Sequence, residues 1–103
     1  MFVAACTKGV SLEVTNETGA PISNIQVTFV GGSVSFPVAE PNLPLKARIN
    51  PVSESNLVLT YIAEDGQVRS NAIDVYIERN YRGSVGIAIR PAGEVQIKDR
   101  TRL

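Results

Sequence analysis

Residues 71–91, NAIDVYIERNYRGSVGIAIRP, give the clearest indication of the fold of this chain. Apolar side chains occupy every second position of two runs, Ile73, Val75 and Ile77 in the first and Val85, Ile87 and Ile89 in the second. This period of two is typical of a β-strand with one face in a hydrophobic core. The polar segment 79–83 between the runs predicts a turn, so we expect the stretch to form a β-hairpin. An isolated hairpin is barely stable, so a second layer must cover its apolar face.

The rest of the chain supplies short alternating runs that can form this second layer. Together with the opening stretch, the expected strands cover residues 10–15, 25–29, 34–38, 45–50, 56–63, 73–78, 85–90 and 95–97. No helix of ordinary length and no internal repeat is visible. Short strands separated by turns at intervals of about ten residues predict an all-β fold, an antiparallel immunoglobulin-like β-sandwich of about seven to eight strands.

Turn-forming residues predict how several of these strands are connected. Gly31-Gly32 suits a tight hairpin, and Pro37 places its strand at a sheet edge or a bulge because proline donates no backbone hydrogen bond. The proline-rich segment 40–44 is expected to cross to the other sheet. Segment 56–63 is apolar at most positions, which predicts a central strand covered on both faces, followed by an Asp-Gly hairpin turn at residues 64–67.

The order of these turns between residues 10 and 97 resembles that of immunoglobulin-like and fibronectin-like modules. The chain lacks tryptophan and a second cysteine, so the resemblance concerns architecture. It implies a domain that binds or spaces other molecules, an expectation by analogy of fold. We therefore expect one domain at residues 10–98, preceded by a tether at residues 1–9 and followed by a tail at 99–103 that frays.

The single cysteine, Cys6, follows Val3, Ala4 and Ala5, and this pattern resembles a bacterial lipobox. The resemblance implies lipidation of Cys6, which would become the first residue of the mature protein, with residues 1–5 removed as part of a signal peptide. A signal peptide needs a basic and then an apolar region upstream. Either the reading frame extends beyond Met1, or the match is accidental and the first residues form an apolar arm with Phe2 and Val3 buried.

Ten basic and ten acidic residues give a net charge of zero, which argues against a nucleic-acid partner. The charges are unevenly distributed: residues 1–78 carry four basic against eight acidic side chains, and residues 79–103 carry six against two. One interpretation is that folding intermixes the two sets on solvated faces. The other is a basic edge at the C-terminal strand that binds an acidic partner or anionic lipid headgroups.

No set of side chains suited to catalysis is apparent, so we expect no enzyme activity and no cofactor. The chain has no histidine, which removes the usual general base and the common zinc ligands. A calcium site formed by Glu54, Glu64 and Asp65 at one end of the sandwich stays an open alternative. Asn16-Glu17-Thr18 matches a glycosylation acceptor, which we interpret as a chance match within a turn.

The candidate contact residues lie in and beside the turn of the opening stretch: Tyr76, Arg79, Tyr81 and Arg82. Tyrosine and arginine are enriched at the energetic centres of protein interfaces. Tyr81 has a second interpretation, in which its ring covers the end of the core and its hydroxyl reaches water.

These features resemble those of small bacterial envelope lipoproteins that carry a β-sandwich behind a lipobox. The leading hypothesis is a non-catalytic interaction or structural domain on the periplasmic side of the cell envelope, anchored to the membrane through Cys6. The alternative is a cytoplasmic, soluble accessory module of a larger secretion or phage-derived assembly. That module would bind a protein partner through a sheet edge or a hairpin tip.

Overall fold

The computed structural model describes residues 9–102, and they form eight β-strands and one short 3-10 turn. In chain order these are β1 (Val10–Asn16), β2 (Ile22–Phe29), β3 (Gly32–Ala39), β4 (Leu45–Ile49), β5 (Ser55–Ile62), β6 (Val68–Ile77), β7 (Arg82–Ile89), η1 (Pro91–Gly93) and β8 (Val95–Arg102). The all-β prediction is confirmed. No helix among the described residues is long and apolar enough to cross a membrane.

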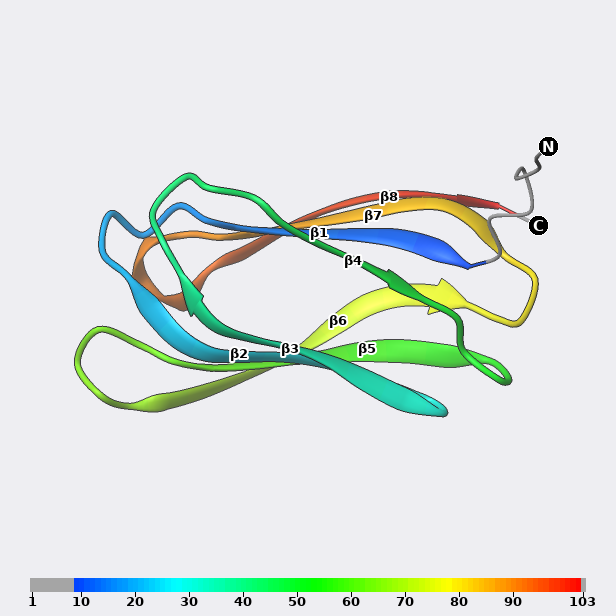
Figure 1. The fold of residues 1–103 in the computed structure, drawn as a ribbon, viewed down its shortest axis with the longest axis horizontal. Helices are drawn as coiled ribbons and strands as arrows, with labels where there is room; N and C mark the ends of the chain where they lie inside the picture. Colours follow the sequence, from blue (N-terminus) through cyan, green and yellow to red (C-terminus); the bar gives the residue numbers. More distant parts are fainter. Residues whose placement is uncertain (1–8, 103) are drawn as a thin grey trace, which may run out of the picture.

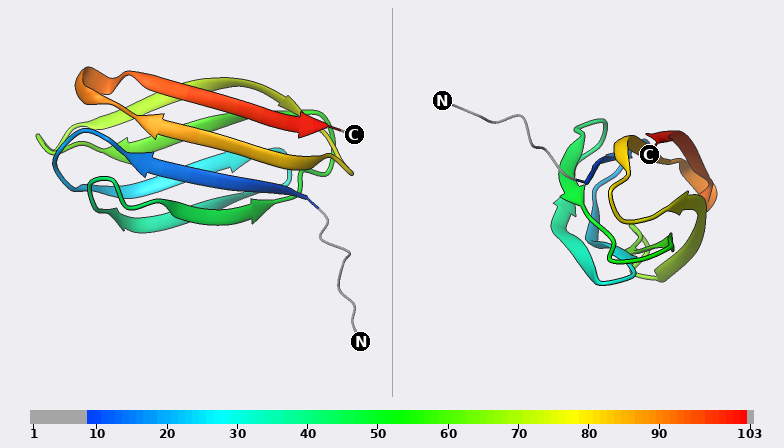
Figure 2. Two further views of the ribbon diagram at one scale, coloured as in Figure 1. Left: turned by 90° about the horizontal axis from the view of Figure 1, so that it is seen from above. Right: turned by 90° about the vertical axis from the view of Figure 1, so that its right-hand side faces the viewer.

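The strands form two four-stranded sheets that stack face to face (Figure 1). Sheet A has the order β4-β1-β7-β8, and sheet B has the order β3-β2-β5-β6. Figure 2 shows sheet A from outside, with β4 in green, β1 in blue, β7 in orange and β8 in red. The predicted β-sandwich is therefore confirmed, with β4 and β8 as the edges of sheet A and β3 and β6 as the edges of sheet B.

Alternation along the strands directs one row of apolar side chains from each sheet into a shared core. The buried apolar residues are Val10, Leu12, Val14, Ile22, Ile25, Val27, Ala39, Ile49, Leu57, Leu59, Tyr61, Ile73, Val75, Ile77, Val85, Ile87 and Ile89. Removing the valine, leucine and isoleucine side chains of this set from water contributes about 1.5–3 kcal/mol each before the loss of chain entropy is counted. The intervening residues face solvent, so a one-residue slip in the pairing of a strand would move its apolar row from the core to the surface.

Several predicted connections are confirmed. β2 and β3 form the predicted antiparallel hairpin, but Phe29 pairs with Gly32, so the two-residue turn is Val30-Gly31 and not Gly31-Gly32. β5 and β6 form the other predicted hairpin. Pro37 lies on the edge strand β3, opposite Asn24, whose φ of 51° marks an irregularity in β2. The segment between β3 and β4 carries the chain from sheet B to sheet A, as expected.

The predicted hairpin over residues 71–91 is wrong, although both of its strands form. β6 belongs to sheet B and β7 to sheet A, so the four residues between them cross from one sheet to the other. Stacked sheets lie about 10 Å apart, a distance that four residues can span. The apolar rows of β6 and β7 face each other across the core, and alternation alone cannot distinguish this arrangement from a hairpin.

Sheet A also departs from a purely antiparallel arrangement. β1 pairs with β4 in the antiparallel sense and with β7 in the parallel sense, with Leu12 opposite Val85 and Val14 opposite Ile87. The other pairs in both sheets are antiparallel. Parallel neighbours cannot be joined by a short turn, and the five strands that lie between β1 and β7 in the sequence provide the long connection that this pair needs.

Two further expectations are wrong. Residues 99–102 do not fray, since they extend β8 and pair with β7 as far as Arg102 opposite Arg82. β5 is central in its sheet but is covered on one face only, because its outward residue Val58 is 41% exposed. Within residues 9–102 no second layer covers the outer face of sheet B, so the apolar residues on the outward parity of β5 remain at the surface.

Candidate functional site

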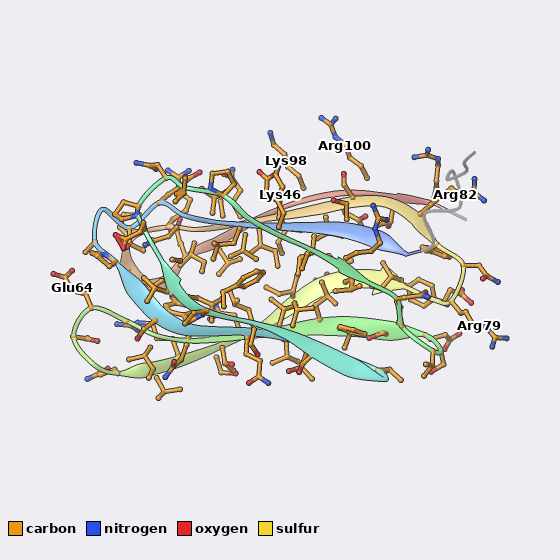
Figure 3. The ribbon with its side chains drawn as sticks, in the orientation of Figure 1. Lys46, Glu64, Arg79, Arg82, Lys98 and Arg100 are labelled. Carbon is orange, nitrogen blue, oxygen red and sulfur yellow. The ribbon has the colours of Figure 1, made fainter. Side chains whose placement is uncertain are left out.

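The four candidate contact residues gather at the end of the sandwich where the chain passes from β6 to β7. The amide of Tyr81 donates to the carbonyl of Glu78 over 3.1 Å and closes a turn with Arg79 and Asn80 at its centre. Asn80 has a φ of 74°, the left-handed conformation that asparagine tolerates and that a type II turn requires at this position. This turn leaves Arg79 exposed at the tip, as Figure 3 shows.

The two tyrosines of this site contact each other edge to face, with ring centroids 6.2 Å apart and ring planes at 66°. Tyr76 lies on the outward parity of β6 and is 49% exposed. Tyr81 is half-buried and packs against the hydrophobic core. Its ring therefore contributes to the core as well as to the surface. Arg82, the first residue of β7, is exposed beside it.

The hydroxyl of Tyr76 lies between two carboxylates. It is 2.8 Å from Oε2 of Glu78 and 3.1 Å from Oε1 of Glu54, and its single proton can be donated to only one of them at a time. The hydrogen bond to Glu78 is the main reason that the pKa of Tyr76 is raised above its ordinary value of 10.0, with Glu54 adding to the effect. Sequence reasoning missed both contacts. Glu78 is two residues from Tyr76 on the same parity, a spacing that could have indicated it, whereas Glu54 precedes β5 and comes to Tyr76 only through the pairing of β5 with β6.

A second feature, which sequence reasoning also missed, is a hollow of about 420 Å³ at the opposite end. Its apolar side includes Ile22 and Tyr61, and its polar rim includes Asp65 and Arg69, which form an ion pair at 3.6 Å. Burial raises the pKa of Tyr61, while the positive charge of Arg69 opposes that shift. The lining comes from strands β2, β5 and β6 and from three separate connections, so no single sequence motif could have indicated it.

The calcium alternative is wrong for geometric reasons. Glu54 immediately precedes β5, and Glu64 and Asp65 follow it in the β5–β6 turn. A strand of eight residues is about 25 Å long, so these carboxylates cannot share one ion. Within residues 9–102, no group of three or more His, Cys, Asp or Glu side chains could hold a metal ion.

Cys6, the candidate lipidation site, lies outside the described residues, as do Phe2 and Val3. Its prediction therefore rests on the sequence.

Comparisons with known proteins address the fold. No family model matches the chain, and no curated protein matches it. Among solved structures it is similar to the NMR structure of a protein from Eubacterium rectale, with a TM-score of 0.64 and 13% sequence identity. The similarity covers 96% of this chain and 95% of the other. It concerns the whole sandwich and supports the fold alone.

Proposed function

We propose that this chain is a non-catalytic binding module of the bacterial cell envelope, anchored to a membrane through lipid on Cys6. The observation that carries the proposal is that the lipobox-like sequence and the folded domain occupy separate, consecutive parts of the chain. All eight strands lie within residues 10–102, and the lipobox-like sequence ends at Cys6, just before the first of them. An envelope lipoprotein needs this order, because the folded domain must follow the modified cysteine directly or through a linker.

The candidate contact surface for a protein partner consists of Tyr76, Arg79, Tyr81 and Arg82. β1 begins at the same end of the sandwich as this surface (Figure 1). A short tether would therefore hold the surface close to the membrane, where a membrane-associated protein partner is accessible. Exposed arginine beside two packed tyrosine rings is a suitable surface for such a contact.

The anchor is tested by mass spectrometry of the protein isolated from bacteria that express its complete reading frame. We expect a mature N-terminus at Cys6, a diacylglyceryl group on its sulfur, and recovery in the membrane fraction. A Cys6→Ser variant should lose both the mass increase and the membrane association. A protein that retains Met1, carries a free thiol and is recovered in the cytosol would refute the anchor.

The partner surface is tested separately by affinity capture from envelope and cytosolic fractions. Arg79→Ala should weaken capture without changing the melting temperature, because Arg79 is exposed at the tip of the turn. Tyr81→Ala should weaken capture and also lower stability, since its ring packs against the core. Glu64→Ala at the opposite end is the control and should leave capture unchanged.

The alternative is a soluble accessory module of a larger assembly, which a different observation favours. β8 is eight residues long and pairs, among the described residues, only with β7, so its outer edge is open to strand addition. Capture of a partner from the cytosolic fraction by a protein with an unmodified Cys6 would favour this alternative.

A further inference from the structure

The outer face of sheet A carries a concentration of positive charge that the neutral composition conceals. Alternation places six basic side chains on this face: Lys46 and Arg48 on β4, Arg82 on β7, and Lys98, Arg100 and Arg102 on β8. The strands place one acidic side chain, Glu13 on β1, on the same face, which gives a net charge of +5. Figure 3 shows Lys46, Lys98 and Arg100 pointing away from the sandwich on this side.

The outer face of sheet B is different. Among the outward residues of its four strands, Asp74 on β6 is the one that carries a charge. The other outward positions are mainly serine, threonine, asparagine, glutamine and small apolar residues. The two broad surfaces of the sandwich therefore differ by about six charges, although the chain as a whole is neutral.

The arrangement on sheet A leaves the cations available to a partner. The central strand β7 presents the small residues Ser84, Gly86 and Ala88, so the long basic side chains of the edge strands β4 and β8 extend farther from the sheet than the residues between them. Two shallow hollows of about 210 and 280 Å³ lie over β1, β7 and β8 on this face. The ion pairs formed within residues 9–102 are Arg69–Asp65 and Arg90–Glu17, so none of the six cations forms an ion pair in the described part of the chain. Glu13 is the one acidic residue placed among them, directly opposite Lys46 in the pairing of β1 with β4.

Two like charges also face each other directly on this surface. Arg82 on β7 pairs in register with Arg102 on β8, and like charges at opposed positions of a sheet destabilise it. An anion bound between them would remove that repulsion. The repulsion therefore favours binding of negatively charged groups at the end where β7 begins and β8 ends.

The position of the first strand indicates which anionic partner this face would meet. β1 lies within sheet A, and Arg48 donates to the carbonyl of Gly9 over 3.3 Å, beside the start of that strand. Four Cα–Cα steps separate Cys6 from Val10, a reach of at most about 14 Å. A lipid on Cys6 would hold this end of sheet A against the membrane surface, where phosphate headgroups are the nearest anions.

We propose that the outer face of sheet A binds the anionic lipid headgroups of the membrane in which Cys6 is anchored. The choice of partner rests on the anchor proposed above, whereas the charge of the face does not. Each basic residue close to an anionic bilayer strengthens binding about fivefold, and the effect declines within about one Debye length of the surface. Together the six cations orient the tethered domain with sheet A toward the bilayer.

The test uses the full chain with Cys6→Ser, so that no lipid attached to the protein contributes to vesicle binding. We expect this protein to sediment with vesicles of phosphatidylglycerol and phosphatidylcholine at a 1:1 ratio, and not with vesicles of phosphatidylcholine alone. Binding should fall steeply between 50 and 200 mM salt, because screening weakens surface electrostatics. Adding Lys98→Gln and Arg100→Gln should weaken binding about thirtyfold, as expected from two cations.

The matched control is Ser33→Glu with Ser35→Glu, which lowers the net charge by the same two units on exposed positions of β3 in sheet B. This control should bind the anionic vesicles much as the Cys6→Ser parent does. Lys46→Gln on the other edge of sheet A provides a second variant, expected to weaken binding about fivefold.

Three results would overturn the proposal. These are failure of the Cys6→Ser protein to bind anionic vesicles at 50 mM salt, equal weakening by the control pair, and tighter binding to an acidic polypeptide such as polyglutamate than to the vesicles. None of these results depends on whether Cys6 is lipidated in cells. Failure of the headgroup surface and failure of the anchor are therefore distinguishable.

Discussion

Among the individual residues, Asn16 joins the two sheets through hydrogen bonds of its side chain. Its side chain is fully buried, and its Nδ2 donates to the carbonyls of Ala20 at 2.7 Å and Ala39 at 2.9 Å. Its Oδ1 accepts from the amide and the hydroxyl of Thr18 at 2.9 and 2.7 Å. These bonds link the end of β1 in sheet A to the end of β3 in sheet B. The match to a glycosylation acceptor therefore marks a buried turn, where a glycan has no room.

Replacing Asn16 by alanine should lower the free energy of unfolding by about 3 kcal/mol. The change removes the side-chain partner of the Ala39 carbonyl and of the Thr18 amide, while the Thr18 hydroxyl still donates to the Ala20 carbonyl. Each buried group left unsatisfied costs about 1–3 kcal/mol. Urea denaturation followed by circular dichroism measures the difference. Asn56→Ala, at an exposed position of β5, is the control and should change stability by less than about 0.5 kcal/mol. Equal effects of the two substitutions would contradict this role of Asn16.

Tyr76 should ionise at a higher pH than an ordinary tyrosine, because its phenolate would lie beside the carboxylates of Glu78 and Glu54. The folded state therefore retains this proton while the unfolded state releases it near pH 10. Stability from this group is present below pH 10 and decreases as the pH rises further. NMR of the tyrosine ring carbons between pH 9 and 12 follows the titration residue by residue.

The substitution Glu78→Gln separates the causes of this shift. It should lower the pKa of Tyr76 toward 10.0, because the bond to Glu78 is the largest contribution. Glu54→Gln should have the smaller effect. An unchanged titration of Tyr76 in the Glu78→Gln variant would show that the hydrogen bond in the structure does not control its ionisation.

Among the elements, the β7–β8 pair depends on a glycine at the end where β7 begins and β8 ends. Gly83 has a φ of 103°, which residues with a side chain rarely adopt, and it lies opposite Thr101. A Cβ at this position would overlap the carbonyl oxygen of Arg100 in the neighbouring strand. Both the backbone conformation and the close approach of β8 therefore require glycine here.

Gly83→Ala should destabilise the protein by about 3 kcal/mol, combining backbone strain with a steric clash that β8 must move to relieve. Gly66→Ala is the matched control, since Gly66 also has a positive φ, 83°, but has no atom within 4 Å of the added Cβ. It should cost about 1 kcal/mol from strain alone. Thermal unfolding measures both, and similar losses in the two variants would indicate that β8 does not pack against Gly83 as closely as the structure has it.

The strands were predictable from the sequence because alternation is a local property. Ile73, Val75 and Ile77 report which face of β6 is buried whatever its neighbours are. Pairing is not local: β7 lies between β1 and β8, and its parallel partner β1 comes some seventy residues earlier. The extension of β8 through Arg102 was missed for the same reason, since its hydrogen-bonding partner β7 stabilises a polar segment that has no apolar pattern of its own.

The candidate surfaces were predictable only in part. The basic C-terminal strand was visible as a block of charges, and β8 does form an edge of sheet A. Lys46 and Arg48, which share its face, come from a strand far away in the sequence. In the same way, Glu54 reaches Tyr76 through the pairing of β5 with β6. Predicting either cluster requires knowing the order of strands in the sheet, and the alternation of apolar residues does not give that order.

The two sheets of the molecule share one core, and neither can keep its apolar face from water without the other. Leu12 on β1 and Leu57 on β5 are both fully buried and belong to this single cluster. A domain with one core is expected to unfold in one cooperative transition. Sheet A and sheet B should therefore lose structure together, even though no hydrogen-bonded strand pair within the described residues joins them.

Truncation of either leucine should consequently weaken the entire fold. Leu12→Ala and Leu57→Ala should each lower the free energy of unfolding by about 2–5 kcal/mol, through lost burial and the cavity left behind. Val58→Ala, on the 41% exposed outer position of β5, is the control and should change it by less than about 0.5 kcal/mol. Urea unfolding should give the same midpoint by far-ultraviolet circular dichroism and by tyrosine fluorescence in every variant. Two separate transitions in Leu12→Ala would show that sheet B can remain folded without sheet A.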